Sequence, residues 1–527
     1  MKTCFIVTGA KLWPTLANTL AEKGVEFKMW LGPKHFECFA KEHHKSATVY
    51  PILELTKGAA LKIEDLPHSP PAEFFTSEAF LRLKDQVYKM MDRQDDFGCY
   101  RRLEREAVFY SLFHYFYSEL VENEIELVIA TEGPHEPTTK IMYGLAGMMG
   151  IRRVHFDISM VIPMMVMREG FEGKRFKVGK RPGDDRTRHH EIMQAYIDSV
   201  LKALDPSAVE PLYMAIQRKS DASFVTKFHH NTKGTGLLGA LRYSQRKIAK
   251  LFKPYYTVRQ IDFLGTPLVP TVSQALAYRR NRIEMKAKLK KQYLASVADA
   301  EKLSFDAPFV YFPLHYEPER TSNPDGGLYY NQFDALAALR DFVPKEVPIY
   351  VKEHYSQFTA KLHGHRGKSL YFWQVMKTLP NVHMLPMEMQ SLELIKRSAF
   401  TASITGTASL ESAVSGKKAV IFGQTWFSGC PNVSQFSDLK DYASFMKEDT
   451  HDLDAVRAFF HDLVENYAIR GYVSQTNEPY WRNKLPDAEA HLAPQPILDD
   501  INHALEKSGF LKPTKSQENK RKTQKSA

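Results

Sequence analysis

The sequence predicts an α/β fold with two doubly wound, Rossmann-like domains. Short apolar runs recur along both halves of the chain, and stretches of helical character separate them. Buried parallel strands have this continuous apolar pattern, and right-handed crossovers place the intervening helices on both faces of a sheet. The length of 527 residues suits two or three domains, and 43% hydrophobic with 25% charged residues is typical of a globular protein.

The second half of the chain has the more regular alternation. Strands are expected at five apolar, largely β-branched or aromatic runs, namely 308–312, 348–352, 382–385, 400–404 and 418–422. Helices are expected between and beyond these strands, at 331–340, 369–378, 391–397, 408–414 and 453–467.

The first half repeats the alternation less regularly. Strands are expected at 4–7, 26–31, 126–130 and 153–156. Helices are expected at 15–23, within a long stretch from 77 to 123, and at 138–149. We therefore predict a Rossmann-like, acceptor-side domain at 1–173 and a Rossmann-like, nucleotide-sugar-binding domain at 305–511.

A basic, helical connecting region is predicted between them at 174–304, with helices at 189–204, 244–253 and 272–297. The tail at 512–527 holds six Lys or Arg against one Glu and is predicted to be disordered. Basic helices of this kind either form a solvated face or contact anionic lipid, and both interpretations stay open.

The net charge of +10 favours anionic partners such as nucleotide phosphates. Nucleic acid is not expected, because no nucleic-acid-binding motif accompanies the charge. The chain has no apolar run long enough for a membrane span and no signal-peptide pattern, so a cytoplasmic location is expected. The four cysteines are scattered and indicate reduced thiols.

The turn after the strand at 400–404 carries the densest set of candidate ligand groups. Gly406 permits a tight turn, and Thr407 begins a helix whose free N–H groups favour an anion. Four residues nearby carry hydroxyl or carboxylate groups that could bind a ligand, namely Thr405, Thr407, Ser409 and Glu411. The alternative is a helix start with nothing bound.

Two further strand ends carry polar residues. Lys352, Glu353 and His354 end the strand at 348–352, where a cation and an imidazole would hold a phosphate. The alternative is an exposed Lys352–Glu353 pair with His354 in a turn. His315 and Arg320 lie in the long polar loop after the strand at 308–312, and loops of this size at a sheet edge are usually functional.

The first half offers candidates for proton transfer. Glu132 and His135 follow the strand at 126–130, and either is a candidate general base for an acceptor hydroxyl. A carboxylate there is also common as a helix cap. Gly9 lies in the first strand-to-helix turn, where close approach of a ligand is expected, but G-x-G-x-x-G, Walker A and metal-binding motifs are missing. We therefore expect no cofactor and no metal.

These motifs together resemble the capsule polysaccharide biosynthesis family, which includes capsular Kdo transferases. The resemblance rests on Tyr311-Phe312-Pro313-Leu314-His315-Tyr316 with Pro318-Glu319-Arg320-Thr321, on Tyr350-Val351-Lys352-Glu353-His354, and on Ile404-Thr405-Gly406-Thr407-Ala408 with Glu411, Gly416-Lys417 and Phe422-Gly423. It covers about residues 305–435 well and the first half more loosely. Related enzymes have His-Pro where this chain has His354-Tyr355, and an acidic pair before Gly where this chain has Thr131-Glu132-Gly133.

The resemblance implies a GT-B glycosyltransferase with two facing Rossmann-like domains. It implies a nucleotide-sugar donor, such as CMP-Kdo or a similar CMP-sugar, and a polysaccharide or glycolipid acceptor. It also implies that the protein acts as a peripheral protein at the inner face of the inner membrane, beside capsule assembly proteins. Alternatives are a nucleotide-sugar epimerase or hydrolase of the same architecture, or a non-catalytic polysaccharide-assembly protein.

Overall fold

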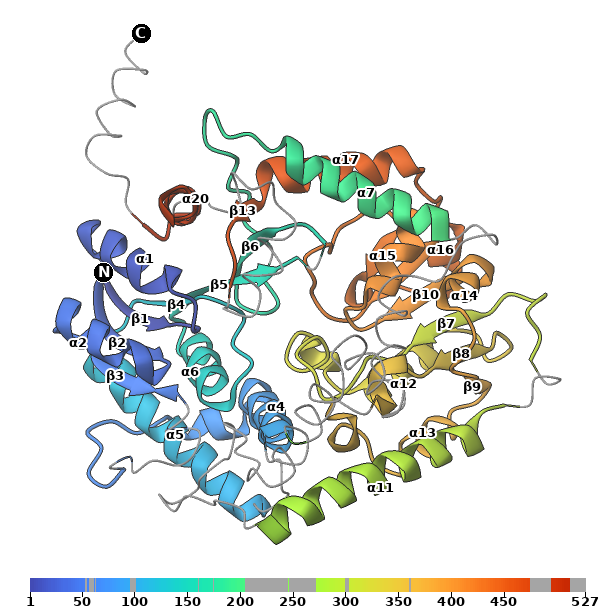
Figure 1. Cartoon of the computed structure of the whole chain (residues 1–527), viewed down its shortest axis with the longest axis horizontal. Helices are drawn as coiled ribbons and strands as arrows, with labels where there is room; N and C mark the ends of the chain where they lie inside the picture. The colour runs from blue at the N-terminus through green and yellow to red at the C-terminus, as the bar shows by residue number, and fades with distance from the viewer. Residues whose placement is uncertain are drawn as a thin grey trace.

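The computed structural model has two α/β lobes, each with its own sheet (Figure 1). It describes residues 1–52, 55, 61, 63–94, 101–159, 161–173, 175–203, 245, 272–298, 303–359, 362–473 and 494–511. Two predicted segments, the helix at 244–253 and the tail at 512–527, lie outside the described residues, apart from Gln245.

The first sheet has the order β13-β6-β5-β4-β1-β2-β3 among the described residues. Its strands are β1 (Lys2–Ile6), β2 (Glu26–Gly32), β3 (Thr48–Pro51), β4 (Leu127–Ala130), β5 (Arg152–Ile158), β6 (Met164–Glu169) and β13 (Ala468–Arg470). The run from β3 to β5 is parallel, whereas β6 and β13 pair antiparallel at one edge. The sheet is therefore mixed rather than wholly parallel as predicted.

Both faces of this sheet are covered, which explains the continuous apolar strands. In β1, Phe5 points into a core with α1 (Leu12–Glu22) and α20 (Pro494–Lys507), and Cys4 and Ile6 point into the opposite core. Helices α4 (Glu78–Gln94), α5 (Arg102–Glu122) and α6 (Pro137–Met148) form that second layer. A short helix, α2 (Glu37–His43), packs against β3.

The second sheet is parallel and has the order β12-β11-β10-β7-β8-β9 among the described residues. Its strands are β7 (Val310–Pro313), β8 (Ile349–Lys352), β9 (Val382–Leu385), β10 (Phe400–Ser403), β11 (Lys418–Ile421) and β12 (Val433–Gln435). Counted from β7, this order is 3-2-1-4-5-6 reversed, the strand order of a Rossmann fold. The predicted fold class, two Rossmann-like domains, is confirmed.

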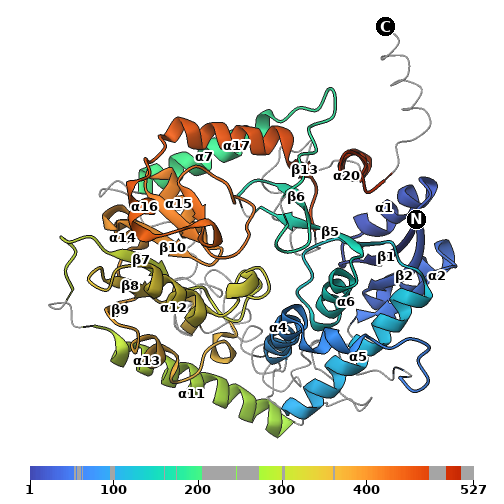
Figure 2. The same cartoon turned by 180° about the vertical axis from the view of Figure 1, so that it is seen from behind.

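Helices cover the second sheet on both sides (Figure 2). One layer contains α7 (Thr187–Ala203), α15 (Thr407–Val414) and α17 (Leu453–Asn466), which share a buried cluster. On the other face, α11 (Val272–Ser296), α12 (Gln332–Phe342), α13 (Phe372–Met376) and α16 (Tyr442–Lys447) share a second buried cluster. Helix α14 (Ser391–Arg397) packs beside α15, over a smaller cluster with Tyr311 of β7.

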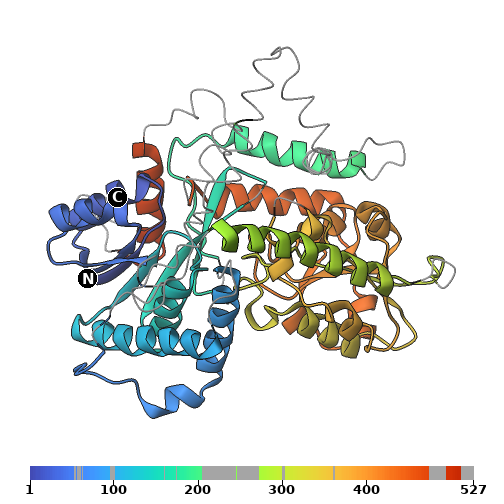
Figure 3. The same cartoon turned by 60° about the horizontal axis from the view of Figure 1, so that its bottom comes forward.

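The chain returns to the first sheet near its end, which differs from the predicted boundary at 511. Ala468–Arg470 pairs with β6, and α20 packs against α1, so this part of the predicted second domain belongs to the first (Figure 3). The connecting region is also divided differently, because α7 and α11 pack directly on the second domain. Within the described residues, no helix is both long enough and apolar enough to cross a membrane.

Candidate active site at the junction of the two sheets

Glu132 stands at the carboxyl end of β4, where the predicted strand end placed it. The preceding residue fixes the turn, because the N–H of Thr131 donates to the carbonyl of Ile6 at 2.9 Å and its hydroxyl accepts from the N–H of Thr8 at 3.0 Å. The Glu132 side chain is 20% exposed. Burial raises the pKa of Glu132 to about 7, against an opposing effect of Arg320.

His135 lies one turn onward and contacts Glu132. Its Nδ1 is 3.6 Å from Oε1 of Glu132 and 3.1 Å from the carbonyl of Gly133. The structure therefore brings the two candidate bases together in one turn before α6.

Arg320 reaches this turn from the second domain. Its Nη2 lies 2.8 Å from Oδ1 of Asp157 at the end of β5, and its Nε lies 3.2 Å from Oδ2 of Asp325. Gly133 permits this approach, since a Cβ there would lie 2.7 Å from Nη2 of Arg320. Nearby acids raise the pKa of Arg320 despite its burial, so a fixed positive charge stands beside Glu132.

Asp157 is a site residue that the sequence analysis missed. Burial alone would raise its pKa, but His155, Arg168 and Arg320 outweigh burial and lower the pKa of Asp157. Its Oδ2 accepts from Nε of Arg168 at 3.0 Å. The signal was available, because Asp157 directly follows the strand predicted at 153–156.

Lys140 is a second residue that the sequence analysis missed. Burial lowers the pKa of Lys140 to about 7, and its Nζ stands 3.8 Å from the centre of the Phe171 ring. Asp325, whose pKa burial raises to about 6, acts on it electrostatically. The sequence offered no signal here, since an isolated Lys inside a helix resembles a surface residue.

His315 holds the loop after β7 against the turn before α15. Its Nε2 accepts from the N–H of Thr405 at 3.3 Å, and its Nδ1 is 3.2 Å from the hydroxyl of Thr321. The Thr405 hydroxyl donates to the carbonyl of Thr321 at 2.6 Å. These hydrogen bonds join the loop after β7 to the turn before α15.

The turn before α15 has exposed and buried members. Thr407 is exposed, and Gly406 and Glu411 are partly exposed. Ser409 is buried, with its hydroxyl 2.8 Å from that of Ser403 and 3.2 Å from the carbonyl of Val420. The Thr407 hydroxyl is hydrogen-bonded to the carboxylate of Glu411, so a ligand that approaches this turn meets the two side chains as a pair.

Lys352 lies close enough to Glu411 for their charges to interact. Burial lowers the pKa of Lys352 to about 8 and raises the pKa of Glu411 to about 7, while each opposes the shift of the other. Nζ of Lys352 donates to the carbonyl of Met389 at 2.6 Å. The end of β8 and the start of α15 therefore form one polar patch.

Glu353 is buried, and protein groups surround its carboxylate. Nζ of Lys368 lies 2.7 and 2.8 Å from its two oxygens, and Nε1 of Trp373 donates to Oε2 at 2.8 Å. This differs from the exposed Lys352–Glu353 pair considered from the sequence.

His354 is exposed at the start of the next turn. Its Nδ1 accepts from the N–H of Ser356 at 3.2 Å, so the ring proton belongs on Nε2. Desolvation by neighbouring groups lowers the pKa of His354 to about 4, so the ring is neutral at pH 7. Gly9, the remaining candidate, lies partly exposed between β1 and α1.

Comparisons with known proteins find solved structures that are similar to this chain at low identity and low TM-score. No protein-family model matches the chain, and no curated protein sequence matches it significantly. A Thermosulfurimonas dismutans KpsC β-Kdo 2,7-transferase structure is 13% identical over 35% of this chain, with a TM-score of 0.21, and the match spans 54% of that protein. The β-Kdo 2,4-transferase of the same organism is 10% identical over 64% of this chain and 79% of that one, with a TM-score of 0.25.

A third solved structure, the UDP-GlcNAc 2-epimerase of Methanocaldococcus jannaschii, is 9% identical over 88% of this chain and 99% of that one, with a TM-score of 0.20. Strand order and pairing define the class of protein, an α/β protein with two Rossmann-like domains.

Proposed function

We propose that this chain is a glycosyltransferase that moves a sugar from a nucleotide-activated donor to a polysaccharide or glycolipid acceptor. The observation that supports it most is the approach of Arg320 to the turn that carries Glu132, where its charge acts on the Glu132 carboxylate. A carboxylate with a pKa near 7 from one domain stands beside a fixed cation from the other. A general base needs a pKa near the working pH, and a departing nucleotide needs positive charge.

The donor would bind at the polar patch of the second sheet. Gly406 caps α15 without a side-chain bond in the described part of the chain, so the first N–H groups of the helix remain for a phosphate. Lys352 and Nε2–H of His354 would add donors to phosphate oxygens. Glu411 would accept from ribose hydroxyls. The resemblance to capsular Kdo transferases favours a CMP-sugar as the donor.

In the proposed reaction, Glu132 accepts the proton of an acceptor hydroxyl. The hydroxyl oxygen forms a bond to the anomeric carbon, and the bond from that carbon to the phosphate oxygen breaks. The nucleotide leaves with the electron pair of that bond, stabilised by the start of α15, Lys352 and Arg320. The charge of Arg320 would also favour the anionic form of Glu132.

A thermal-shift screen against CMP, UDP, GDP and their sugars tests donor binding. A true ligand at 100 times its dissociation constant should stabilise the fold by about 2.7 kcal/mol. Transfer of labelled sugar to a glycan acceptor then tests the reaction. Donor turnover without any acceptor would instead favour an epimerase or hydrolase, and the absence of nucleotide binding would contradict an enzyme of this class.

We also propose peripheral contact with anionic inner-membrane lipid through α11. Ile283 and Leu294 are 68% and 50% exposed, and eleven positions of a helix bring them back to one face. Exposed Lys288, Lys290 and Lys291 lie between them in the sequence. Co-sedimentation with anionic liposomes should fall in the double variant Ile283→Gln/Leu294→Gln, and it should fall for the wild-type chain at high salt. If the variant and the wild-type chain co-sediment equally, this contact is contradicted. Capsule assembly proteins would be partners at the same membrane face.

A further inference from the structure

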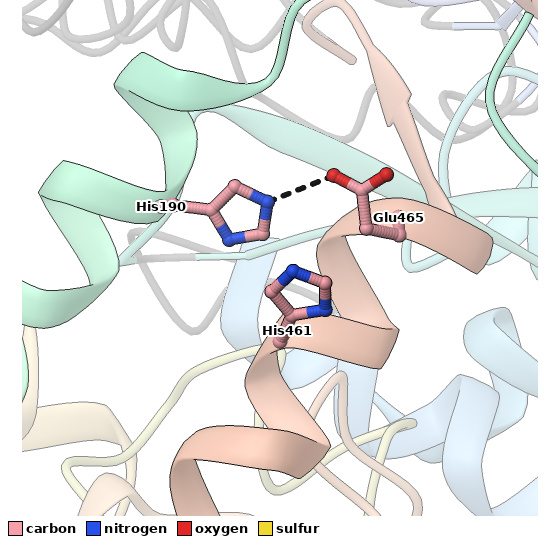
Figure 4. Close-up of side chains that lie close together, drawn as sticks. All are labelled: His190, His461 and Glu465. Carbon is pink, nitrogen blue, oxygen red and sulfur yellow. Dashed lines mark hydrogen bonds and ion pairs between the residues drawn. The ribbon is translucent and has the colours of Figure 1, made fainter.

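Two histidines and a glutamate gather where α7 packs on α17, outside the proposed active site. His190 comes from α7, and His461 and Glu465 come from α17 (Figure 4). One possible ligand atom from each residue lies within 4.8 Å of the others. Sequence motifs did not indicate this group, because 275 positions separate His190 from Glu465.

The helices bring these side chains together for simple geometric reasons. Residues four apart on a helix lie on the same face, so His461 and Glu465 are neighbours on α17. The apolar residues Met193, Ile197 and Phe460 bury the contact between the two helices. The His190 and His461 rings then stack with centroids 4.6 Å apart and planes at 19°.

Glu465 is oriented by a cation that leaves one oxygen for the histidines. Nζ of Lys180 lies 2.6 Å from Oε2, and Nε2 of His190 lies 2.8 Å from Oε1. A carboxylate that is held at one oxygen and presents the other is the usual arrangement of an oriented metal ligand. Partial burial opposes the anionic form of Glu465, but the contacts with Lys180 and His190 stabilise it and lower the pKa of Glu465.

We propose that His190, His461 and Glu465 bind one divalent transition-metal ion of the zinc type. Two imidazole nitrogens and one carboxylate oxygen are the ligands that zinc prefers, whereas magnesium and calcium prefer oxygen alone. Bonds of about 2.0–2.1 Å in a tetrahedral site separate neighbouring ligand atoms by roughly 3.3 Å. Nε2 of His190 and Oε1 of Glu465, which lie 2.8 Å apart, therefore need to move apart by about 0.5 Å. The ion would then replace the proton that lies between them.

Three protein ligands leave a fourth position of the ion open. A pocket of about 760 Å³ is lined by both helices, with His190 and His461 among its residues. Water or a small anionic ligand would occupy the fourth position from this pocket. The ion would also tie α7, which follows the first domain in the chain, to α17, which leads back to β13 of the first sheet.

The test uses the full chain without a polyhistidine tag, stripped with chelator and titrated with Co²⁺ as a spectroscopic probe. We expect one equivalent to bind with ligand-field absorption, and Zn²⁺ to displace it. Mg²⁺ should not displace it. His190→Gln, His461→Gln and Glu465→Gln should each weaken Co²⁺ binding at least tenfold, as expected when a ligand is lost. The matched control is His451→Gln, since His451 is exposed and precedes α17.

A second measurement needs no variant and covers the case in which a variant fails to fold. Zn²⁺ should protect His190 and His461 of the wild-type chain from carbethoxylation, read by mass spectrometry, and should leave His451 reactive. Less than one fifth of an equivalent bound, or equal protection of all three histidines, would overturn the proposal. The proposal would also be overturned if the three ligand variants bound Co²⁺ as tightly as the wild-type chain.

Discussion

Nη2 of Arg320 lies 2.8 Å from Oδ1 of Asp157, and this ion pair joins the loop after β7 of the second domain to the end of β5 in the first. The two side chains are 19% and 16% exposed, so water screens the pair little. The pair therefore couples the two sheets at the place where the candidate base stands.

Loss of this pair should destabilise the fold. Arg320→Ala leaves Asp157 with Arg168 and His155, and it removes the cation that contacts Asp325. Breaking a buried pair costs about 3–5 kcal/mol, and the remaining partners of Asp157 should reduce this to roughly 2–4 kcal/mol. Urea denaturation without ligand measures the change.

The matched control for that measurement is an exposed arginine pair. Arg188 lies 2.9 Å from Glu191, with side chains 44% and 57% exposed. Arg188→Ala should cost less than about 1 kcal/mol. Equal losses for the two variants would show that the contact between Arg320 and Asp157 does not hold the domains together.

The buried Glu353–Lys368 pair should act on stability. Both side chains are fully buried. Lys368→Met leaves a buried carboxylate without its cation, which costs about 3–5 kcal/mol. Adding Glu353→Gln should recover much of that loss, because the amide needs no counter-ion. Chemical denaturation of the single and double variants checks this, and a loss below about 1 kcal/mol in Lys368→Met would refute it.

Nucleotide binding should depend on Thr407 at the start of α15. Its side chain is exposed, so Thr407→Val removes the hydroxyl and its hydrogen bond to Glu411 without opening a cavity. We expect nucleotide affinity to fall by roughly tenfold, the equivalent of one good hydrogen bond to a charged group. Calorimetric titration with the nucleotide found by thermal shift measures it. Ser409→Ala is the comparison, because its buried hydroxyl bonds within the protein, and that variant should lose stability rather than affinity.

The second domain was predicted closely because its elements are locally encoded. Val382–Leu385 and Ser391–Arg397 have the predicted bounds, since short apolar runs end at turn residues there. The three-residue strand Ala468–Arg470 was not predicted, because only its pairing with β6 makes it a strand. Periodicity cannot reveal which distant strand a short segment joins.

The site was predictable in part for a similar reason. Strand ends indicated Glu132 and Arg320, and the structure places them within electrostatic reach of one another. The sequence could not show that Lys368 and Trp373 occupy the carboxylate of Glu353, because residue type says nothing of its partner. Asp157 was missed because the predicted strand ends at Phe156, whereas β5 continues through Asp157 to Ile158.

Catalysis should follow the protonation of Glu132. A base works when it is deprotonated, so with a pKa of about 7 the transfer rate should rise with pH between about 6 and 8 and then level. Glu132→Gln should lower turnover by about 10²–10⁴-fold while nearly keeping donor affinity, and it should abolish that rise. His354→Ala should instead weaken donor binding as well as turnover.

His135→Ala distinguishes the two candidate bases. His135 is close enough to act in place of Glu132, because its Nδ1 lies 3.6 Å from Oε1 of Glu132. If His135→Ala abolishes transfer while Glu132→Gln keeps both the rate and the pH profile, the base is His135. If both variants stay active, neither residue is the base, and the turn after β4 only caps α6.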